Sequence, residues 1–303
     1  MILIIAVVLS ACGGSTGTGS AGKTAVDVSD IISGDAGESG FDMIQVATGE
    51  KEARCDSCVI DYSMTEKGYV MMDYSAGTSN KIKAQVKGPG TTYSYNLEPG
   101  VWSAFPLSDG DGTYQFSILE NVDGQRYALL ISAEAEVTLE DEFAPFLKPN
   151  QYVNYADAPK TVAVAKRLAG DETDALKLVA SVYDFVTGYL SYDKELAQNV
   201  KTGYLPVLDD VLVKGKGICF DYAAVMTGML RSLGVPCKLV VGYAGDAYHA
   251  WISVYVEGEG WIENVVYFDG NSWQRMDPTF ASAGSSNNEF IGNGDNYIAK
   301  YFY

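Results

Sequence analysis

The stretch Gly215-Lys216-Gly217-Ile218-Cys219-Phe220-Asp221-Tyr222-Ala223 opens the segment that organises the C-terminal half of this chain of 303 residues. Gly215 and Gly217 allow the backbone to turn tightly before the cysteine. The residues that follow, Ile218–Leu233, predict a helix that ends before Gly234 and Pro236. Cys219 would then begin a helix, where unpaired N–H groups and the helix dipole favour a thiolate.

The regions on either side predict an α+β domain over residues 146–303. Apolar residues recur three and four positions apart before the cysteine, which predicts helices over Asp157–Leu168 and Glu172–Leu190, the second with Asp171 as its N-cap. Strands are predicted after the cysteine, the last two joined by a Gly270-Asn271 turn: Cys237–Tyr243, His249–Val256, Val265–Phe268 and Trp273–Asp277. Helices followed by an antiparallel sheet make an α+β arrangement.

A histidine and an aspartate follow the cysteine in distinctive local settings. His249 is the only histidine of the chain. Asp277 precedes Pro278, which holds its backbone extended. A thiol, an imidazole and a carboxylate are the groups that a cysteine nucleophile with an oriented base requires. We therefore treat Cys219, His249 and Asp277 as the candidate catalytic set.

Several of these segments, taken in order, resemble the transglutaminase-like superfamily of cysteine acyltransferases and hydrolases. The resemblance rests on residues 190–193 (LSYD), 215–223 (GKGICFDYA), 231–243 (RSLGVPCKLVVGY), 249–251 (HAW) and 277–280 (DPTF). It implies a papain-like fold in which Cys219 is the nucleophile, His249 the general base and Asp277 the orienting acid. Residues 256–267 lengthen the connection between His249 and Asp277, which leaves the shape of the substrate groove open.

The chemistry expected of this set is attack on an amide carbonyl to give a thioester. Tyr192 and Tyr204 are candidates for a second oxyanion donor beside the Cys219 N–H, and Trp251 is a candidate wall of the acyl site. Water would complete a peptidase or amidase reaction, and an amine would complete a crosslink; the sequence leaves both open. Protein or peptide substrates are expected, cell-wall peptides among them. The alternative is a catalytically silent binding or surface-structural lipoprotein on the same scaffold.

Residues 41–145 predict an antiparallel β-sandwich. Short runs alternate apolar with polar residues, which is typical of half-buried strands, and Gly/Pro/Asp turns separate them. The predicted strands are 68–75, 81–87, 91–97, 113–119 and 126–132. Tyr62, Tyr69, Tyr74, Tyr93 and Tyr95 suit either a binding face or ordinary strand positions.

The N-terminal residues predict a lipoprotein of the extracytoplasmic face of a bacterial membrane. An apolar run too short to span a bilayer leads into Leu9-Ser10-Ala11-Cys12, which resembles a lipobox with lipid attachment at Cys12. Residues 1–12 would be the signal segment and residues 13–40, rich in small and polar residues, a flexible tether. The net charge of −18 argues against nucleic acid as a partner.

The remaining cysteines are Cys55, Cys58 and Cys237. Cys55-Asp-Ser-Cys58 could be a disulfide, a redox pair or half of a zinc site. A disulfide is the interpretation we prefer, because the chain has neither a second CxxC nor a spare histidine. No loop has the ligand spacing of a calcium site, and we predict no metal and no cofactor. A Cys219–Cys237 bond would mask the nucleophile.

Overall fold

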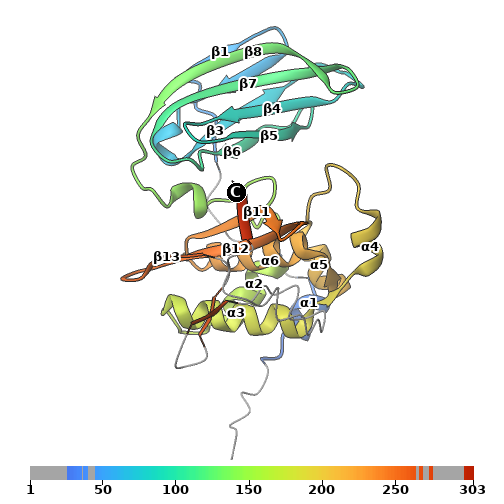
Figure 1. Ribbon diagram of the computed structural model, residues 1–303, viewed down its shortest axis with the longest axis vertical. Helices are drawn as coiled ribbons and strands as arrows, with labels where there is room; N and C mark the ends of the chain where they lie inside the picture. The colour runs from blue at the N-terminus through green and yellow to red at the C-terminus, as the bar shows by residue number, and fades with distance from the viewer. Residues whose placement is uncertain (1–25, 36, 40–44, 264–265, 269–272, 276–296) are drawn as a thin grey trace, which may run out of the picture.

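The computed structural model describes residues 26–35, 37–39, 45–263, 266–268, 273–275 and 297–303. Cys12 and Asp277 lie outside these residues. The fold is α+β and mostly antiparallel, with a two-sheet β-sandwich above a helical and sheet-containing part (Figure 1). None of the helices described is both long and apolar enough to cross a membrane.

The sandwich consists of two antiparallel sheets of four strands each, in the orders β1-β2-β3-β6 and β5-β4-β7-β8. Its strands are β1 (Glu52–Arg54), β2 (Cys58–Asp61), β3 (Tyr69–Tyr74), β4 (Ile82–Lys87), β5 (Thr92–Leu97), β6 (Ser103–Pro106), β7 (Gly112–Asp123) and β8 (Arg126–Val137). The predicted strands are all present. β1, β2 and β6 were not predicted, because they are short and show little alternation of apolar and polar residues.

The sandwich core is aromatic. Along β4, β5 and β7 alternate side chains are buried, Ile82, Tyr93 and Phe116 among them, because successive residues of a strand point to opposite faces. Tyr69, Tyr74, Tyr93 and Tyr95 are each at most 5% exposed. The suggestion that these tyrosines form a binding face is therefore wrong: they pack the interior.

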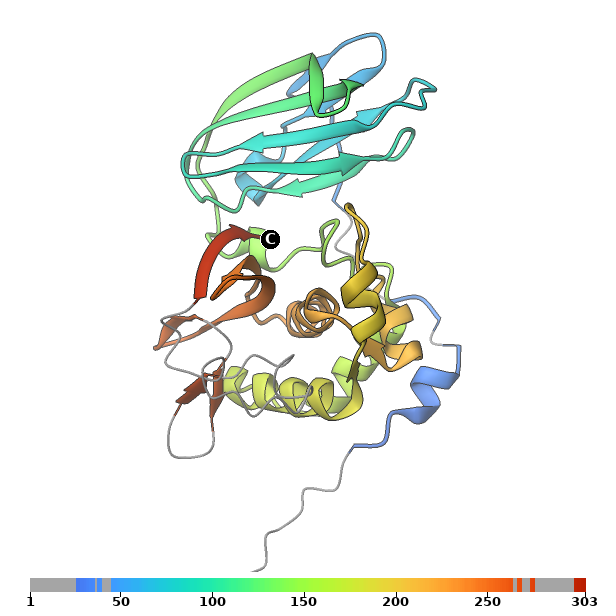
Figure 2. The ribbon, with the colours of Figure 1, turned by 45° about the vertical axis from the view of Figure 1, so that its right-hand side comes forward.

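The second half surrounds one buried helix, α6 (Cys219–Ser232), which Figure 2 shows nearly end-on at the centre. Around it lie α2 (Pro159–Ala169), α3 (Ala175–Tyr189), α4 (Lys194–Asn199), α5 (Leu208–Lys214) and the two-stranded parallel pair β9 (Ser191–Tyr192) and β10 (Lys216–Gly217). Asp174, and not Asp171, caps α3, because its carboxylate accepts from the N–H groups of Leu176 and Lys177. The helix begins three residues later than expected.

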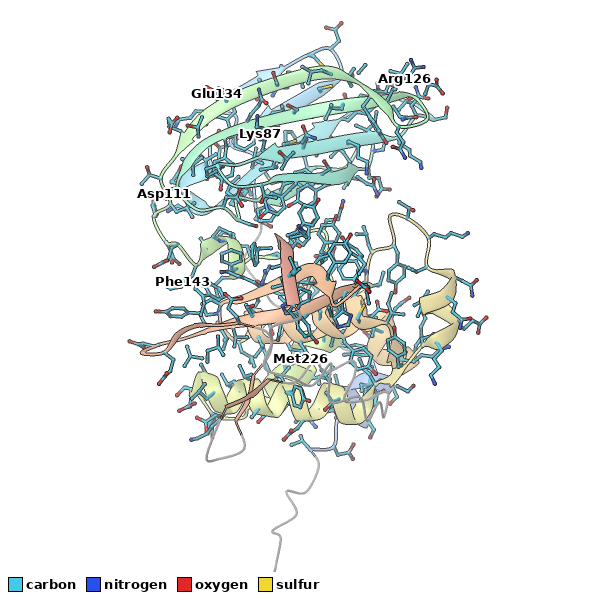
Figure 3. The ribbon with its side chains drawn as sticks, in the orientation of Figure 1. Lys87, Asp111, Arg126, Glu134, Phe143 and Met226 are labelled. Carbon is cyan, nitrogen blue, oxygen red and sulfur yellow. The ribbon has the colours of Figure 1, made fainter. Side chains whose placement is uncertain are left out.

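An antiparallel sheet of order β13-β12-β11-β16 covers α6 on its other side. Its strands are β11 (Cys237–Ala244), β12 (Ala247–Val256), β13 (Gly260–Ile262) and β16 (Tyr297–Phe302). Separately, β14 (Val266–Phe268) pairs antiparallel with β15 (Trp273–Arg275). Every residue of α6 from Asp221 to Ser232 is buried. Figure 3 shows Met226 of this helix among the side chains between sheet and helices.

Aromatic side chains join the two halves. The ring of Tyr303, after β16, lies 5.7 Å from that of Tyr93 and 5.8 Å from that of Tyr95, both in the sandwich. The ring of Tyr152, in the connection between the halves, packs at a tilt against that of Tyr303, with centroids 4.2 Å apart. The sandwich is thus packed on the α6 domain through a continuous aromatic contact.

Part of the segment expected to be a flexible tether is folded. Within residues 13–40, a helix α1 (Ser29–Ser33) packs against α2 and α5. Val28 is only 5% exposed, and Lys160 Nζ donates to the Ile32 carbonyl at 2.6 Å. Val28 and two isoleucines supply enough apolar surface to dock this part of the segment. The average composition of residues 13–40 is small and polar and does not reveal this short apolar cluster.

Candidate functional site

Cys219 is the first residue of α6. The first intrahelical bond runs from the Tyr222 N–H to the Ile218 carbonyl, so the Cys219 N–H points out of the helix start without an intrahelical acceptor. The side chain of Cys219 is partly exposed and its thiol is free. A reachable sulfur beside an open N–H, at the positive end of a helix dipole, is the arrangement expected of a nucleophile.

Element lengths predict which end of the helix His249 lies near. α6 is about 21 Å long at 1.5 Å per residue. A short turn then starts β11, which returns along the helix, and Cys237 to Gly242 covers about 17 Å at 3.3 Å per residue. His249 on β12 pairs with Gly242, and β12 packs on α6. From these lengths we expect Cys219 and His249 to lie at one end of the same helix–sheet layer.

His249 and Trp251 point to the same side of β12. His249 is 6% exposed and Trp251 is 1% exposed, whereas Tyr248, the residue before His249 on β12, is 62% exposed. The rings of His249 and Trp251 are stacked with centroids 6.3 Å apart. Tyr297 meets the Trp251 ring edge-on at 5.0 Å. Trp251 thus packs beside the candidate base as a core residue, and its role as an acyl-site wall stays a prediction.

Gly242 explains how these rings approach so closely. A Cβ on Gly242 would lie 2.1 Å from the Ile298 carbonyl oxygen and 2.9 Å from the Trp251 ring. Only a residue without a side chain allows β16 and Trp251 to close around this position. The role of Gly242 is not evident from the sequence, where the only signal is a glycine inside an otherwise apolar strand.

The start of α6 is fixed by Asp221. Its carboxylate accepts from the Ile218 N–H at 2.8 Å and from the Tyr204 hydroxyl at 2.7 Å. Gly217 is required beside it, because a Cβ there would lie 2.5 Å from the Asp221 Cβ. Asp221 therefore holds the backbone on both sides of Cys219.

The two oxyanion candidates differ in their surroundings. Tyr204 donates its hydroxyl proton to Asp221, so that proton is already engaged in the structure, and the role of Tyr204 as an oxyanion donor stays a prediction. Tyr192 on β9 pairs with Gly217 of β10, which places it next to the segment leading into Cys219. Its role as a donor stays a prediction. Asp277 lies outside the described residues.

We expect Asp221→Ala to lower the free energy of unfolding by about 2 kcal/mol, because it removes two buried hydrogen bonds and leaves their donors unpaired. Asp221→Asn should cost less than about 1 kcal/mol, since its oxygen can accept from Ile218 and its amide can donate to the Tyr204 oxygen. Urea unfolding of the three proteins measures the difference. Equal losses in both variants would contradict this account.

The difference in stability between the wild type and Asp221→Asn should depend on pH. Burial raises the pKa of Asp221 above its ordinary 3.8, although the hydrogen bonds from Ile218 and Tyr204 oppose the shift. The folded state therefore holds this proton more tightly than the unfolded chain. The stability of the wild type relative to Asp221→Asn should fall as the pH rises from below 3.8 through the raised pKa.

The remaining thiols are not paired in the structure. Cys237 is buried and its Sγ contacts the Thr227 hydroxyl at 3.6 Å, so it does not mask Cys219. Cys55 and Cys58 are both free thiols, which corrects the expected disulfide. They flank the turn between β1 and β2, and each sulfur lies 3.8 Å from the Ser57 hydroxyl. That turn is closed by the Cys55 N–H, which donates to the Cys58 carbonyl at 2.9 Å, so backbone bonding alone suffices to hold it.

Among the free thiols outside the candidate site, Cys55 should be alkylated first. Burial opposes ionisation of Cys55, but hydrogen bonds from Cys58 and Ser57 outweigh it and lower the pKa. Burial raises the pKa of Cys58 and of Cys237 to about 12. Peptide mass mapping after brief iodoacetamide treatment at pH 7.5 measures the order. Earlier labelling of Cys58 or Cys237 would contradict it.

In the part of the chain that the structure describes, no three His, Cys, Asp or Glu side chains are grouped as metal ligands.

Comparison with known proteins identifies the domain. Residues 162–278 match the family model of the transglutaminase-like superfamily. The chain is 28% identical over 120 residues to kyphoscoliosis peptidase of Mus musculus. That match covers 35% of this chain and 16% of the peptidase. It is 28% identical over 141 residues to the uncharacterized protein ML0607 of Mycobacterium leprae, which covers 46% of each. The chain thus spans less than half the length of these relatives.

A crystal structure of red sea bream transglutaminase aligns with 76% of this chain and 49% of its own, at a TM-score of 0.30 and 14% identity. That score is too low to compare sites. The family match covers both Cys219 and His249 and agrees with the order of motifs in the sequence. The chain therefore carries a domain of the transglutaminase-like superfamily, and both candidate residues belong to it.

Proposed function

We propose that the chain is a cysteine enzyme that acts on amide bonds of peptides or proteins through a thioester formed at Cys219. The observation that supports the proposal is that Cys219 begins a buried helix and that His249 is on a strand packed against the same helix. A thiol with an adjacent imidazole is the arrangement that activates cysteine nucleophiles.

The proposed reaction has two stages. The Cys219 sulfur attacks the amide carbonyl, and the C–N bond breaks as His249 gives its proton to the departing amine. The thioester is then attacked by water or by a second amine, which restores the thiol. Asp277 is proposed to orient His249, and the Cys219 N–H to donate to the oxyanion.

The substrate class and location are part of the same proposal. A lipid at Cys12 would hold the enzyme at the extracytoplasmic face of a bacterial membrane, with surface proteins or wall peptides within reach. The docking of α1 on α2 and α5 of the helical half supports this proposal (Figure 1), because a lipid attached upstream of α1 would lie nearer in sequence to that half than to the sandwich.

Trapping of the acyl-enzyme tests the proposal. The full chain would be incubated with a panel of glutamine-containing and other peptides, with and without a labelled primary amine, and quenched in acid. Mass spectrometry should find an acyl adduct on the Cys219 peptide, together with cleavage or amine incorporation. Cys219→Ala must abolish all three signals, whereas Cys55→Ala, which removes a remote reactive thiol, must not.

Two negative results would overturn the proposal. One is the absence of adduct, cleavage and amine incorporation over the whole panel. The other is alkylation of Cys219 no faster than that of an unfolded cysteine peptide. Together they would favour a binding lipoprotein on the same scaffold.

A further inference from the structure

A cavity lies between the two halves, on the side of the loop that connects α4 to α5. Its volume is about 360 Å³, at the lower end of the range for ligand pockets. The residues that matter here are Lys81, Lys83, Asn96 and Tyr127 from the sandwich and Thr202 and Gly203 from the loop. Figures 1 and 2 both show this loop rising from the helical half toward the sandwich.

The pocket is built by specific contacts around Asn96. The Asn96 side-chain oxygen accepts from Lys83 Nζ at 2.7 Å, and its carbonyl accepts from Gln151 Nε2 at 2.7 Å. Gly203 has a positive φ of 88°, and a Cβ there would lie 3.0 Å from Asn96 Nδ2. Sandwich, connecting segment and loop therefore meet at one amide side chain.

The charge of the pocket is opposite to that of the protein. The chain carries 39 acidic and 21 basic side chains, yet two lysines line this cavity, and within the described residues neither forms an ion pair with a carboxylate. Burial, and then the charge of Lys81, lower the pKa of Lys83, so the two ammonium groups repel one another. An anion between them would relieve that repulsion and neutralise both charges.

We infer that this pocket binds a carboxylate group of a peptide. Lys81 and Lys83 would supply the charge, and the Asn96 amide and Thr202 hydroxyl additional donors. Ile82, Leu97 and Pro99 form an apolar wall beside them, which suits the carbon atoms next to a carboxylate. The volume admits a peptide terminus or one acidic side chain and excludes a folded partner.

The pocket is connected to the candidate active site through one loop. Gly203 is followed by Tyr204, whose hydroxyl holds Asp221, and Asp221 fixes the start of the helix at Cys219. The inference rests on the proposed function in one respect: the carboxylate would belong to the peptide that Cys219 attacks or to the acceptor that resolves the thioester.

Binding in a protein that cannot react tests this inference separately from catalysis. The full chain with Cys219→Ala would be titrated with N-acetyl-trialanine and with its C-terminal carboxamide, followed by ¹⁵N NMR shifts of the amides in residues 81–83, 96 and 202–203. The carboxylate should bind at least about tenfold more tightly than the carboxamide. Lys83→Met should weaken the carboxylate about tenfold, and Lys83→Arg should retain most of the affinity.

Lys87→Met is the matched control. Lys87 lies on the same strand, β4, but outside the pocket, and is exposed (Figure 3). It should leave binding unchanged and so separate a local effect from the loss of one positive charge. Equal affinity for carboxylate and carboxamide, an unchanged affinity in Lys83→Met, or no shifts at millimolar peptide would each overturn the inference. Saturable, carboxylate-selective binding without any thioester in the wild type would overturn the proposed function and leave this pocket standing.

Discussion

His249→Ala is expected to lower the rate of Cys219 acylation by about 10³-fold. The variant removes the group proposed both to ionise the thiol as a base and to protonate the leaving amine as an acid. His249 is the only histidine of the chain, so no second imidazole can replace it. Single-turnover mass spectrometry of the acyl-enzyme, formed from an activated peptide ester and from the matching amide, measures the effect.

The two substrates separate the two roles of His249. An ester needs little protonation of its leaving group, so its acylation should fall less than that of the amide. Tyr248→Ala is the control, because Tyr248 is the neighbouring residue but is 62% exposed and points away from His249. A loss smaller than tenfold with the amide would mean that His249 is not the base.

The α6 region could be predicted because several signals agree there. Glycines before Cys219, an apolar helical pattern and a Gly/Pro stop define α6 to within one residue at each end. The strands after it follow from β-branched runs that a buried sheet requires. A local pattern that agrees with its tertiary environment is the case in which sequence reasoning works best.

Other features depended on contacts that the sequence does not display. The sandwich tyrosines fit a core as well as a surface, and only the second sheet decides between them. α1 forms because α2 offers Lys160 and an apolar surface to Val28. Asp221 and Gly242 matter through Tyr204 and Ile298, which lie far from them along the chain. Each of these is decided by a long-range partner.

Arg231→Met is expected to destabilise the fold by about 3–5 kcal/mol. Arg231 is 1% exposed in the last turn of α6. It donates to the carbonyls of Cys237 at 2.9 Å, Lys148 at 2.7 Å and Tyr303 at 2.5 Å. Methionine fills a similar volume but leaves three buried acceptors without donors, each costing about 1–3 kcal/mol before relaxation.

The effect reaches beyond one helix, because the three carbonyls belong to β11, to the connection from the sandwich and to the residue after β16. Burial lowers the pKa of Arg231 to about 10, so the side chain remains charged at neutral pH and all its N–H groups stay available. Urea unfolding should show a lower midpoint for Arg231→Met and an intermediate one for Arg231→Lys, whose single ammonium cannot span three acceptors.

Arg126→Met is the control, since Arg126 is an exposed arginine paired with Asp123 at the far end of the sandwich (Figure 3). It should change the free energy of unfolding by less than about 0.5 kcal/mol. A loss in Arg231→Met as small as that of the control would show that other donors satisfy the three carbonyls, and that contacts other than those of Arg231 hold the two halves together.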